Sequence, residues 1–546
     1  MIRDFNELED GSSFDADLCI IGAGAAGITL AREFLSAGHR ILVVEGGGHQ
    51  PEAETQQLYS SEVVGMPHSG IHAGRARMLG GTTTLWAGQT LPLDEIDFRH
   101  RPWVPHSGWP LTRAELEPYY RRAEQTLHLS AIAYDAAAWP YRTLPPPAYD
   151  PAKLRPLVSQ FSPKPNFALA YRPALQKSAN VMVLLHANAV NLQTNPAGTC
   201  LQAIELRSLA GKRGQVRARC AVVCCGAIEN ARLLLASNRV QPNGLGNAHG
   251  CVGRFFQDHL GAKTARVRVK EPSRLRALYD AFYSCGVAIC PKIALSVAVQ
   301  EQRQVLNATV GLTYDQTVGV DSPVESAKRV ARAIWNRTLD LPIPAPAGPT
   351  SAVRRYGIGG FAGDCLSMVT HPFAVGRALY HRAILRRPAF RYEGDAYVAL
   401  LSECEAIPAS CVSLSSERDA MGMPRARLNW RLSEMTKRTA IVAVETLAEE
   451  FRRLNLGDVD LATLDTERIL CAPETVFVDM NHHIGTTRMS DHPQNGVVNR
   501  DCRLHSVENL FIAGSSVFPT SGHSNPTFTI LALAIRLADH LKQTLR

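Results

Sequence analysis

Residues 17–48 read DLCIIGAGAAGITLAREFLSAGHRILVVEGGG, and they decide the fold of the chain. The first apolar run is typical of a strand buried on both faces of a parallel sheet. A GxGxxG turn follows at once, then a helical pattern that ends near Gly38, and then a second strand at residues 41–44. This order of strand, glycine turn, helix and strand predicts a Rossmann-type nucleotide-binding unit.

Each glycine of the turn has a physical role in holding a dinucleotide. Gly22 permits the tight bend, Gly24 lets a pyrophosphate approach the backbone, and Gly27 lets the helix pack closely on the strand. The start of the helix directs free N–H groups and the positive end of its dipole toward the phosphates. Glu45 ends the second strand, where its carboxylate can accept both ribose hydroxyls of an adenosine. We therefore expect the ADP half of FAD or NAD.

The composition is that of an ordinary globular protein of two or three domains. Of the 546 residues, 45% are apolar and 20% are charged, and the net charge is +8. No apolar run approaches the ~18 residues of a membrane span, and no basic tract resembles a nucleic-acid groove. Residues 1–17 resemble neither a secretory signal nor a transit peptide, so we expect a cytoplasmic location. Thirteen cysteines without CxxC spacing indicate reduced thiols, and no cluster predicts a metal site.

Two later strands also end in glycine, as the first strand does. One covers residues 216–225 before Gly226 and a helix, and the other covers residues 510–512 before Gly514. Strands of this kind can touch a ligand that lies along their carboxyl ends. The stretch GGTTTLWAG at 80–88 suits a backbone pressed against a flat polar ring, although a turn before a buried tryptophan has the same pattern.

We expect an α/β fold of two domains, one of them discontinuous. The Rossmann-type domain comprises residues 1–264, with a proline-rich excursion near 90–165, and residues 475–546. Residues 265–474 lack glycine-rich junctions and predict an α+β substrate domain of sheet and helices.

Several helices are predicted in the substrate domain, over residues 324–337, 375–387 and 436–453, with a loop at 341–350. The middle helix has an arginine face opposite an apolar face: Arg377, Arg382, Arg386 and Arg387 against Val375, Leu379 and Ile384. A solvated face on an edge helix is the interpretation that we favour. Contact with a membrane surface or an acidic partner is the alternative.

Taken together, these segments resemble the glucose–methanol–choline (GMC) flavoprotein oxidoreductases. The resemblance rests on the Rossmann unit, GGTTTLWAG, the strand–glycine–helix at 225–235, GRFFQDH, HHIGT and GSSVFPTSGHSNPT, in collinear order. SGWPLTRAELEPYYRRAE and SERDAMGMPRARLNW are similar to the branch of pyranose oxidase and bacterial sugar or polyol dehydrogenases. The resemblance implies a Rossmann-type FAD-binding domain. Leu85 stands where some members tether FAD through a histidine, which implies non-covalent flavin.

The resemblance also implies which residues contact FAD, most of them through backbone or small size. They lie in the dinucleotide turn, the glycine–threonine stretch, the adenine contact and the C-terminal loop: Gly22, Gly24, Ala25, Gly27, Glu45, Gly46, Gly81, Thr82, Thr83, Trp86, Ala87, Val190, Gly226, Ser515, Asn525, Pro526 and Thr527. Asn525 and Pro526 also predict a helix start, with Asn525 as N-cap and Pro526 at the first helical position.

The family chemistry implies alcohol oxidation, in which the hydroxyl loses a proton while a hydride passes to flavin N5. His482 is implied as the base, because a neutral imidazole with a pKa of ~6.5 suits that task. Asn525 would hold the alcohol oxygen by a hydrogen bond. His483 and His523 are open alternatives for a share in this role.

The predicted function is therefore FAD-dependent oxidation of an alcohol to a carbonyl, with a sugar, polyol or aminoglycoside-like substrate. One alternative is a flavin-dependent lyase or decarboxylase on the same scaffold. Another is a flavoprotein subunit that passes electrons to a cytochrome and reaches the periplasm with a signal-bearing partner. We expect a small-molecule alcohol and oxygen or a quinone as partners, with no nucleic acid, no membrane span and no metal.

Overall fold

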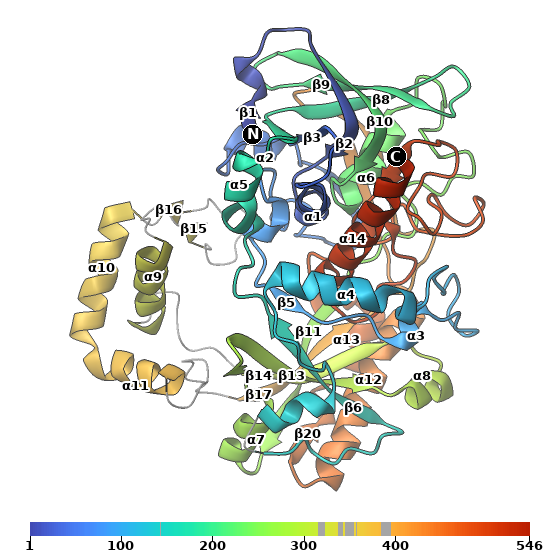
Figure 1. Ribbon diagram of the computed structural model, residues 1–546. Coiled ribbons are helices and arrows are strands. Elements are labelled where there is room, and N and C mark those ends of the chain that lie inside the picture. The colour runs from blue at the N-terminus through green and yellow to red at the C-terminus, as the bar shows by residue number, and fades with distance from the viewer. Residues whose placement is uncertain (142–143, 315–322, 337–341, 344–353, 356, 384–394) are drawn as a thin grey trace.

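The computed structural model of the chain describes residues 1–141, 144–314, 323–336, 342–343, 354–355, 357–383 and 395–546. Two large sheets organise these residues, one in each half of the view in Figure 1, with the helix α4 (Arg113–Leu127) drawn between them. Thr112 caps α4 through a capping box with Glu115, as a helix start requires.

The first sheet is a Rossmann-type sheet with an antiparallel extension. Its strand order is β1-β7-β3-β2-β10-β9-β8, and β22 also pairs with β10. The strands β1, β7, β3, β2, β10 and β22 run parallel, whereas β9 and β8 are antiparallel. The bounds are β1 (Ile2–Asp4), β2 (Ser12–Ile21), β3 (Ile41–Val44), β7 (Val181–Leu185), β8 (Asn188–Thr194), β9 (Leu201–Arg207), β10 (Arg213–Val223) and β22 (Leu510–Ile512). The predicted α/β class is thereby confirmed.

Register brings the carboxyl ends of four strands to one edge of this sheet. Ile21 pairs with Val44 on one side and with Val223 on the other, and Val223 also pairs with Ile512. Three of these strand ends lead into helices: α1 (Ala25–Glu33), α6 (Ala227–Ala236) and, through a short 3₁₀ turn, α14 (Thr527–Thr544). A ligand at this edge therefore meets segments from both ends of the chain.

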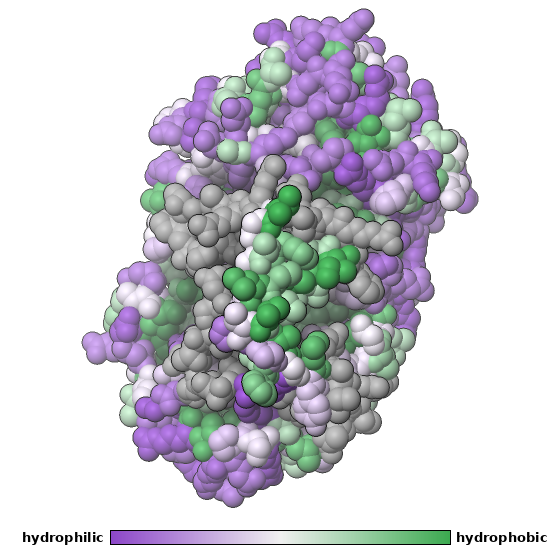
Figure 2. All heavy atoms as spheres, turned by 90° about the vertical axis from the view of Figure 1, so that its left-hand side faces the viewer, coloured by the Kyte–Doolittle hydropathy of each residue, from purple (hydrophilic) through white to green (hydrophobic). Residues whose placement is uncertain are grey.

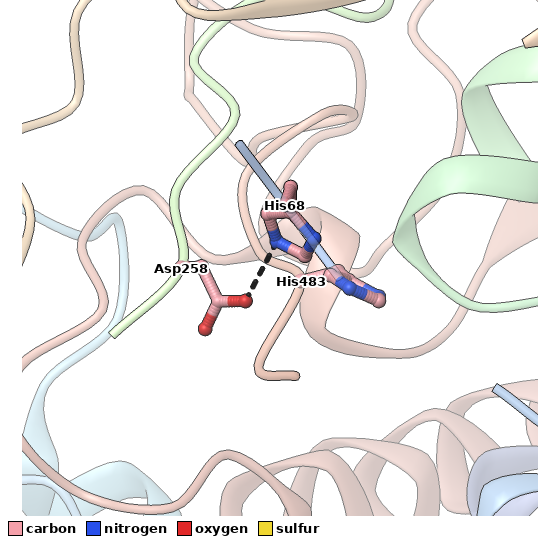
Figure 3. Close-up of side chains that lie close together, drawn as sticks. All are labelled: His68, Asp258 and His483. Atoms are coloured by element: carbon pink, nitrogen blue, oxygen red, sulfur yellow. Dashed lines mark hydrogen bonds and ion pairs between the residues drawn. The ribbon is translucent and has the colours of Figure 1, made fainter. Parts of the chain in front are cut away.

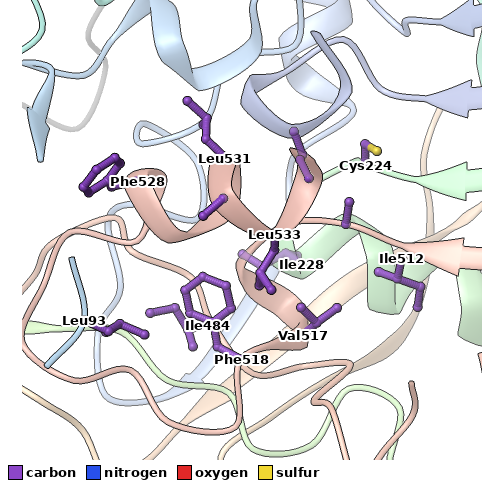
Figure 4. Packing of buried hydrophobic residues seen from close by; sticks show 14 of the residues in the cluster. Leu93, Cys224, Ile228, Ile484, Ile512, Val517, Phe518, Phe528, Leu531 and Leu533 are labelled. Carbon is purple, nitrogen blue, oxygen red and sulfur yellow. The ribbon is translucent and has the colours of Figure 1, made fainter. Parts of the chain in front are cut away.

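The helix α14 is buried on most of its surface, as its nearly continuous apolar sequence predicts. Figure 4 shows Phe528, Leu531 and Leu533 of α14 in one core cluster with Ile228 of α6 and Phe518. This packing fixes the C-terminal loop that precedes α14 against the first sheet.

Two predicted helix ends were wrong. The helix α1 ends at Glu33, because Asn180 Nδ2 donates to the carbonyls of Phe34, Ala37 and His39 and turns the chain before Gly38. The helix α14 begins at Thr527 with Pro526 as its N-cap, so Asn525 lies one residue further out than we predicted. The side chain of Asn525 is thereby free to bond elsewhere.

The second sheet is antiparallel, with the strand order β20-β11-β17-β14-β13-β6-β5. It takes β5 and β6 from the stretch predicted as an excursion, because β6 pairs with β13 and β5 pairs with β6, rather than with the first sheet. The helix α12 (Glu434–Arg453), predicted from its periodicity, contacts β14 and β17. The bounds are β5 (Gln89–Thr90), β6 (Leu154–Phe161), β11 (Leu260–Val269), β12 (Phe282–Ser284), β13 (Val287–Leu295), β14 (Ala308–Tyr314), β17 (Ala396–Ser402), β20 (Gly457–Asp460) and β21 (Val478–Asp479).

The remaining elements connect or cover the two sheets. A small third sheet pairs β18 with β19 and β19 with β4. The bounds are β4 (Glu62–Gly65), β18 (Cys411–Arg418), β19 (Pro424–Trp430), β15 (Pro342–Ile343), β16 (Arg354–Arg355), α2 (Ala53–Gln57), α3 (Glu95–Phe98), α5 (Phe167–Lys177), α7 (Pro272–Tyr279), α8 (Val297–Arg303), α9 (Pro323–Asn336), α10 (Gly357–Thr370), α11 (Pro372–Ala383) and α13 (Thr466–Cys471).

The helices α9, α10 and α11 form a layer at the left of Figure 1, in the stretch between β14 and β17. Figure 2 shows apolar side chains gathered on this layer, and Phe373 is 92% exposed. Leu379 is also exposed, so the apolar face predicted for the helix at 375–387 is not buried at that position. Arg386, Arg387 and Ile384 of that prediction lie outside the described residues, as does most of the predicted loop at 341–350.

All thirteen cysteines are free thiols. None of the helices in the described part of the chain has both the length and the apolar content that crossing a bilayer requires.

Candidate functional site

A cavity of about 630 Å³ lies at the carboxyl ends of the first sheet's strands. That volume lies in the range of small-molecule and cofactor sites. Residues predicted to contact FAD supply much of its lining: Gly22, Gly24, Ala25, Glu45, Gly46, Gly81, Thr82, Thr83, Trp86, Ala87, Gly226, Ser515, Asn525, Pro526 and Thr527. His482 lies in the same wall.

Two of the predicted contact residues, Gly27 and Val190, do not line the cavity. A Cβ on Gly27 would clash with the carbonyl oxygen of Gly22, so this glycine serves the packing of α1 against the turn. Val190 packs against Leu58 and Met421, and its neighbour Ala189 lines the cavity in its place.

The cavity wall suits a dinucleotide near Gly24. No side chain caps α1 at Gly24, so the first N–H groups of the helix are available to an anion. A Cβ on Gly24 would meet no atom within 4 Å, which leaves room for a group to approach its backbone. Gly81 has a φ of +52°, and a Cβ there would lie 2.8 Å from Gly24 Cα, so glycine is needed for the two turns to touch.

The Glu45 carboxylate accepts hydrogen bonds from the backbone N–H groups of Ala23 and Gly47, at 2.8 and 3.0 Å. Burial raises the pKa of Glu45, and these hydrogen bonds and the charge of Arg77 oppose that rise. The carboxylate thus holds the glycine turn at the end of the cavity where we expect the adenosine.

A cluster of arginines beside Glu45 was missed by the sequence reasoning. Arg77 donates to Asn188 Oδ1 at 2.9 Å and lies over the ring of Tyr59. Arg75 pairs with Glu229 at 2.8 Å. Burial raises the pKa of Glu229, but Arg232, Arg75 and Arg77 together lower it to about 2. The letters GRAR just before the glycine pair were the available signal, since paired cations beside a glycine turn suit phosphate.

The structure brings His482 and Asn525 together. Asn525 Nδ2 lies 3.2 Å from His482 Nε2, and both residues line the cavity. Within the described part of the chain, the buried Oδ1 of Asn525 has no hydrogen-bond donor. The end of the cavity therefore presents an imidazole nitrogen and an amide with unused capacity.

The hydrogen bonds of His259 assign the proton of His482. His259 Nε2 lies 2.8 Å from the carbonyl oxygen of Gly522, which can only accept, so Nε2 of His259 carries a proton and donates. In a neutral His259, Nδ1 is then an acceptor, and it lies 2.8 Å from Nδ1 of His482. His482 therefore donates from Nδ1, which leaves its Nε2 without a proton beside Asn525.

His68 and Asp258 hold the backbone of His482. The N–H of His482 donates to Asp258 Oδ1 at 2.8 Å, and His68 Nε2 lies 3.0 Å from Asp258 Oδ2. His68 Nδ1 accepts from the N–H of Ile71 at 3.1 Å, so its Nε2 carries the proton that Asp258 accepts.

Figure 3 shows His483 beside His68 and Asp258, and potential ligand atoms of these three residues lie within 4.8 Å of one another. The hydrogen bonds already satisfy His68 and Asp258 without a metal ion. The ring of His483 lies 5.1 Å from that of His68, and His483 also lines the cavity. Its buried Nε2 has no hydrogen-bond partner among the described residues, so a share of His483 in the site stays a prediction.

His523 is turned away from His482 and Asn525. Its Nε2 lies 3.1 Å from Asp94 Oδ2, and the residue does not line the cavity. Burial raises the pKa of Asp94, but the bonds and charges of His523 and Arg155 bring that pKa well below its usual value. His523 thus takes part in a buried hydrogen bond with Asp94 that anchors the C-terminal loop.

Two family descriptions match the chain. Residues 17–244 match the family described as FAD dependent oxidoreductase, and residues 407–534 match the family described as GMC oxidoreductase.

Three curated proteins are similar over almost the whole chain. 2-Methyl-1,2-propanediol dehydrogenase of Mycolicibacterium austroafricanum is 23% identical, over 97% of this chain and 96% of that protein. The fructose dehydrogenase large subunit of Gluconobacter japonicus is 21% identical, over 98% and 99%. 6'''-Hydroxyparomomycin C oxidase of Streptomyces lividus is 24% identical, over 96% and 92%.

Among solved structures, a fungal aryl-alcohol oxidase matches with a TM-score of 0.55 and 15% identity, over 98% of this chain and all of that one. At this identity the likeness shows the fold alone.

Proposed function

Because this chain belongs to the GMC oxidoreductases, FAD-dependent enzymes that act on alcohols, we propose that it oxidises a sugar, polyol or aminoglycoside-like alcohol with His482 as base. The observation that carries the proposal is the unprotonated Nε2 of His482 beside Asn525, in a cavity formed by glycine-bearing strand ends.

The chain's own residues handle the proton and the oxygen of the alcohol. When bound, FAD accepts the hydride that leaves the carbinol carbon. His482 Nε2 takes the hydroxyl proton, and Asn525 Nδ2 donates to the oxygen as negative charge develops on it. The alcohol thereby loses one hydride and one proton and becomes a carbonyl compound.

His482 is suited to this step because it stays neutral. Burial lowers the pKa of His482 well below its ordinary value, and the neighbouring His259 and Lys292 lower it further. At pH 7 the imidazole is therefore unprotonated and ready to accept a proton. Its modest basicity also lets it release that proton after the reaction.

For FAD itself we propose the cavity-lining residues, with Glu45 and Arg77 at the adenosine and phosphate end. Leu85 lines the cavity and cannot form a covalent bond to the flavin, which supports non-covalent binding. Gly27 and Val190 support this site through packing alone.

The identity of the electron acceptor stays a prediction, with oxygen, a quinone or a cytochrome as candidates. Similarity to a protein named as a large subunit supports a partner subunit as acceptor. The same similarity supports the alternative to the cytoplasmic location predicted from the sequence, in which the chain reaches the periplasm with a partner subunit.

Anaerobic mixing of the yellow holoenzyme with sugars, polyols and aminoglycosides tests the proposal. We expect at least one alcohol to bleach the flavin and yield a carbonyl product. His482→Ala should keep the yellow colour and lower the rate of bleaching by ~10²–10⁴-fold, the usual contribution of a general base. A product formed without any bleaching would instead indicate a lyase or decarboxylase. An unchanged rate in the variant would remove His482 from the base role.

A further inference from the structure

Lys292 of β13 lies on the face of the second sheet that is turned toward the cavity. Residues directly opposite each other in antiparallel strands point to the same face, and Cys290, two residues before Lys292, pairs with Ser159. The Oγ of Ser159 accepts from Gln89 Nε2 at 2.8 Å, and Gln89 lines the cavity. Because side chains alternate between the two faces along β13, the side chain of Lys292 points to the same face of the sheet as that of Gln89.

This face has open space beside Lys292. On the neighbouring strand β14, a Cβ on Gly311 would meet no atom within 4 Å. Gly311 in turn pairs with Ala399 of β17, another small residue. Farther along the sheet, a Cβ on Gly261 of β11 would clash with Met480, which lines the cavity. A substrate between the flavin site and the sheet would thus lie over small residues, with Lys292 on one side of it. Lys263, which pairs with Ala399 on the other side, lies over the ring of Tyr397.

The ammonium group of Lys292 has no partner of its own in the part of the chain that the structure describes. Among the residues that the structure describes, none gives it a hydrogen bond or an ion pair, although the side chain is half-buried. Burial lowers the pKa of Lys292, which is the expected cost of an unpaired charge. Its charge also lowers the pKa of His482, so the two groups are close enough for their charges to interact. An anion placed there would gain a charge-assisted hydrogen bond.

We propose that Lys292 binds a carboxylate of the substrate, so that the enzyme acts on hydroxy acids or sugar acids while a separate hydroxyl meets His482. The inference rests on the proposed alcohol oxidation. A single ammonium matches the single charge of a carboxylate, whereas a phosphate dianion would need further cations. The same charge repels ammonium groups, which removes polycationic aminoglycosides from the candidate substrates.

The test compares three alcohols of one carbon skeleton: gluconate, neutral glucitol and cationic glucamine. We expect the wild-type holoenzyme to show a kcat/KM for gluconate ~10–100-fold above that for glucitol, the effect of one hydrogen bond to a charged group. Lys292→Gln should abolish that preference by raising KM for gluconate more than KM for glucitol. Lys292→Arg should retain the preference, and Lys292→Glu should transfer it to glucamine. Lys153→Gln, which removes a lysine paired with Glu449 at the surface, is the matched control.

Calorimetric titration of the holoenzyme with gluconate separates this inference from the proposed function. Binding that weakens at least tenfold in Lys292→Gln supports the carboxylate site even if no alcohol is oxidised. Equal use of gluconate and glucitol by the wild type would overturn the inference. A loss of kcat for both alcohols in Lys292→Gln would also overturn the inference, because it would place the ammonium on the reacting oxygen. Tighter binding of glucose 6-phosphate than of gluconate would overturn it as well.

Discussion

Replacement of His259 by leucine tests the proton assignment at His482, the proposed base. In the native site, Nδ1 of His482 donates to Nδ1 of His259 at 2.8 Å. Leucine removes this acceptor and leaves a buried N–H without a partner, at a cost of about 1–3 kcal/mol. Nδ2 of Asn525 faces His482 Nε2, so the alternative tautomer, with the proton on Nε2, can donate to the unused Oδ1 of Asn525 once that amide turns over. The proton should therefore move to the nitrogen that must accept one from the substrate.

The energy of one lost hydrogen bond sets the size of the effect. A shift of about 1–3 kcal/mol changes the ratio of the tautomers by roughly 5–150-fold. We expect His259→Leu to lower the rate of flavin reduction by about 10–100-fold while KM changes little. His259→Gln is the matched control, because its amide can accept from His482 and donate to the Gly522 carbonyl.

Anaerobic stopped-flow measurement of flavin bleaching, repeated across pH, gives the readout. His259 contributes to the low pKa of His482, so its loss should move the acid limb of the rate profile to higher pH. A purely structural role would lower the rate without moving that limb. If His259→Leu reduced flavin as fast as the wild type, the assigned tautomer would be refuted.

Two further predictions concern the glycine turn and the buried histidines. Gly27→Ala should prevent stable folding, because the added Cβ clashes with Gly22. Gly24→Ala should fold normally and lose FAD on dialysis. The flavin absorbance and the thermal unfolding of both variants check these two outcomes. Burial lowers the pKa of both His482 and His483 in the folded state. In the unfolded chain these histidines have an ordinary pKa of ~6.5, so below that pH the unfolded state binds more protons than the folded state. The free energy of unfolding should thus fall as pH drops from 7 to 5, by up to ~1.4 kcal/mol per histidine and pH unit. Urea titrations should show a smaller loss of this free energy in the double variant that carries both His482→Asn and His483→Asn. The same loss in that double variant would contradict the assignment to these residues.

Much of the nucleotide site could be predicted because its signals are local. The apolar run before Gly22 and the acid at Glu45 are set by neighbours in sequence, and both fall at the expected strand ends. The helix after the turn was predicted too long, because Asn180, far along the chain, ends it. The strands β5 and β6 were assigned to an excursion for a similar reason, since β6 pairs with the distant strand β13 and β5 pairs with β6.

The support around the catalytic pair could not be read from the sequence. The contact of His259 with His482 spans 223 positions, and that of His68 with Asp258 spans 190. Rules based on hydrophobic periodicity or motif spacing cannot predict contacts between residues so far apart in the sequence. His523, which shares a motif with Asn525, points instead to Asp94. Proximity in sequence was therefore a poor guide to which histidine lies beside Asn525.

The central claim is that glycine-bearing strand ends from both termini hold FAD and bring the bare nitrogen of His482 to the substrate. The most direct measurement is the visible spectrum of the purified protein before and after anaerobic addition of an alcohol substrate. The account predicts a yellow protein whose flavin absorbance disappears as a carbonyl compound forms in equal amount. A colourless protein that FAD cannot reconstitute would contradict it.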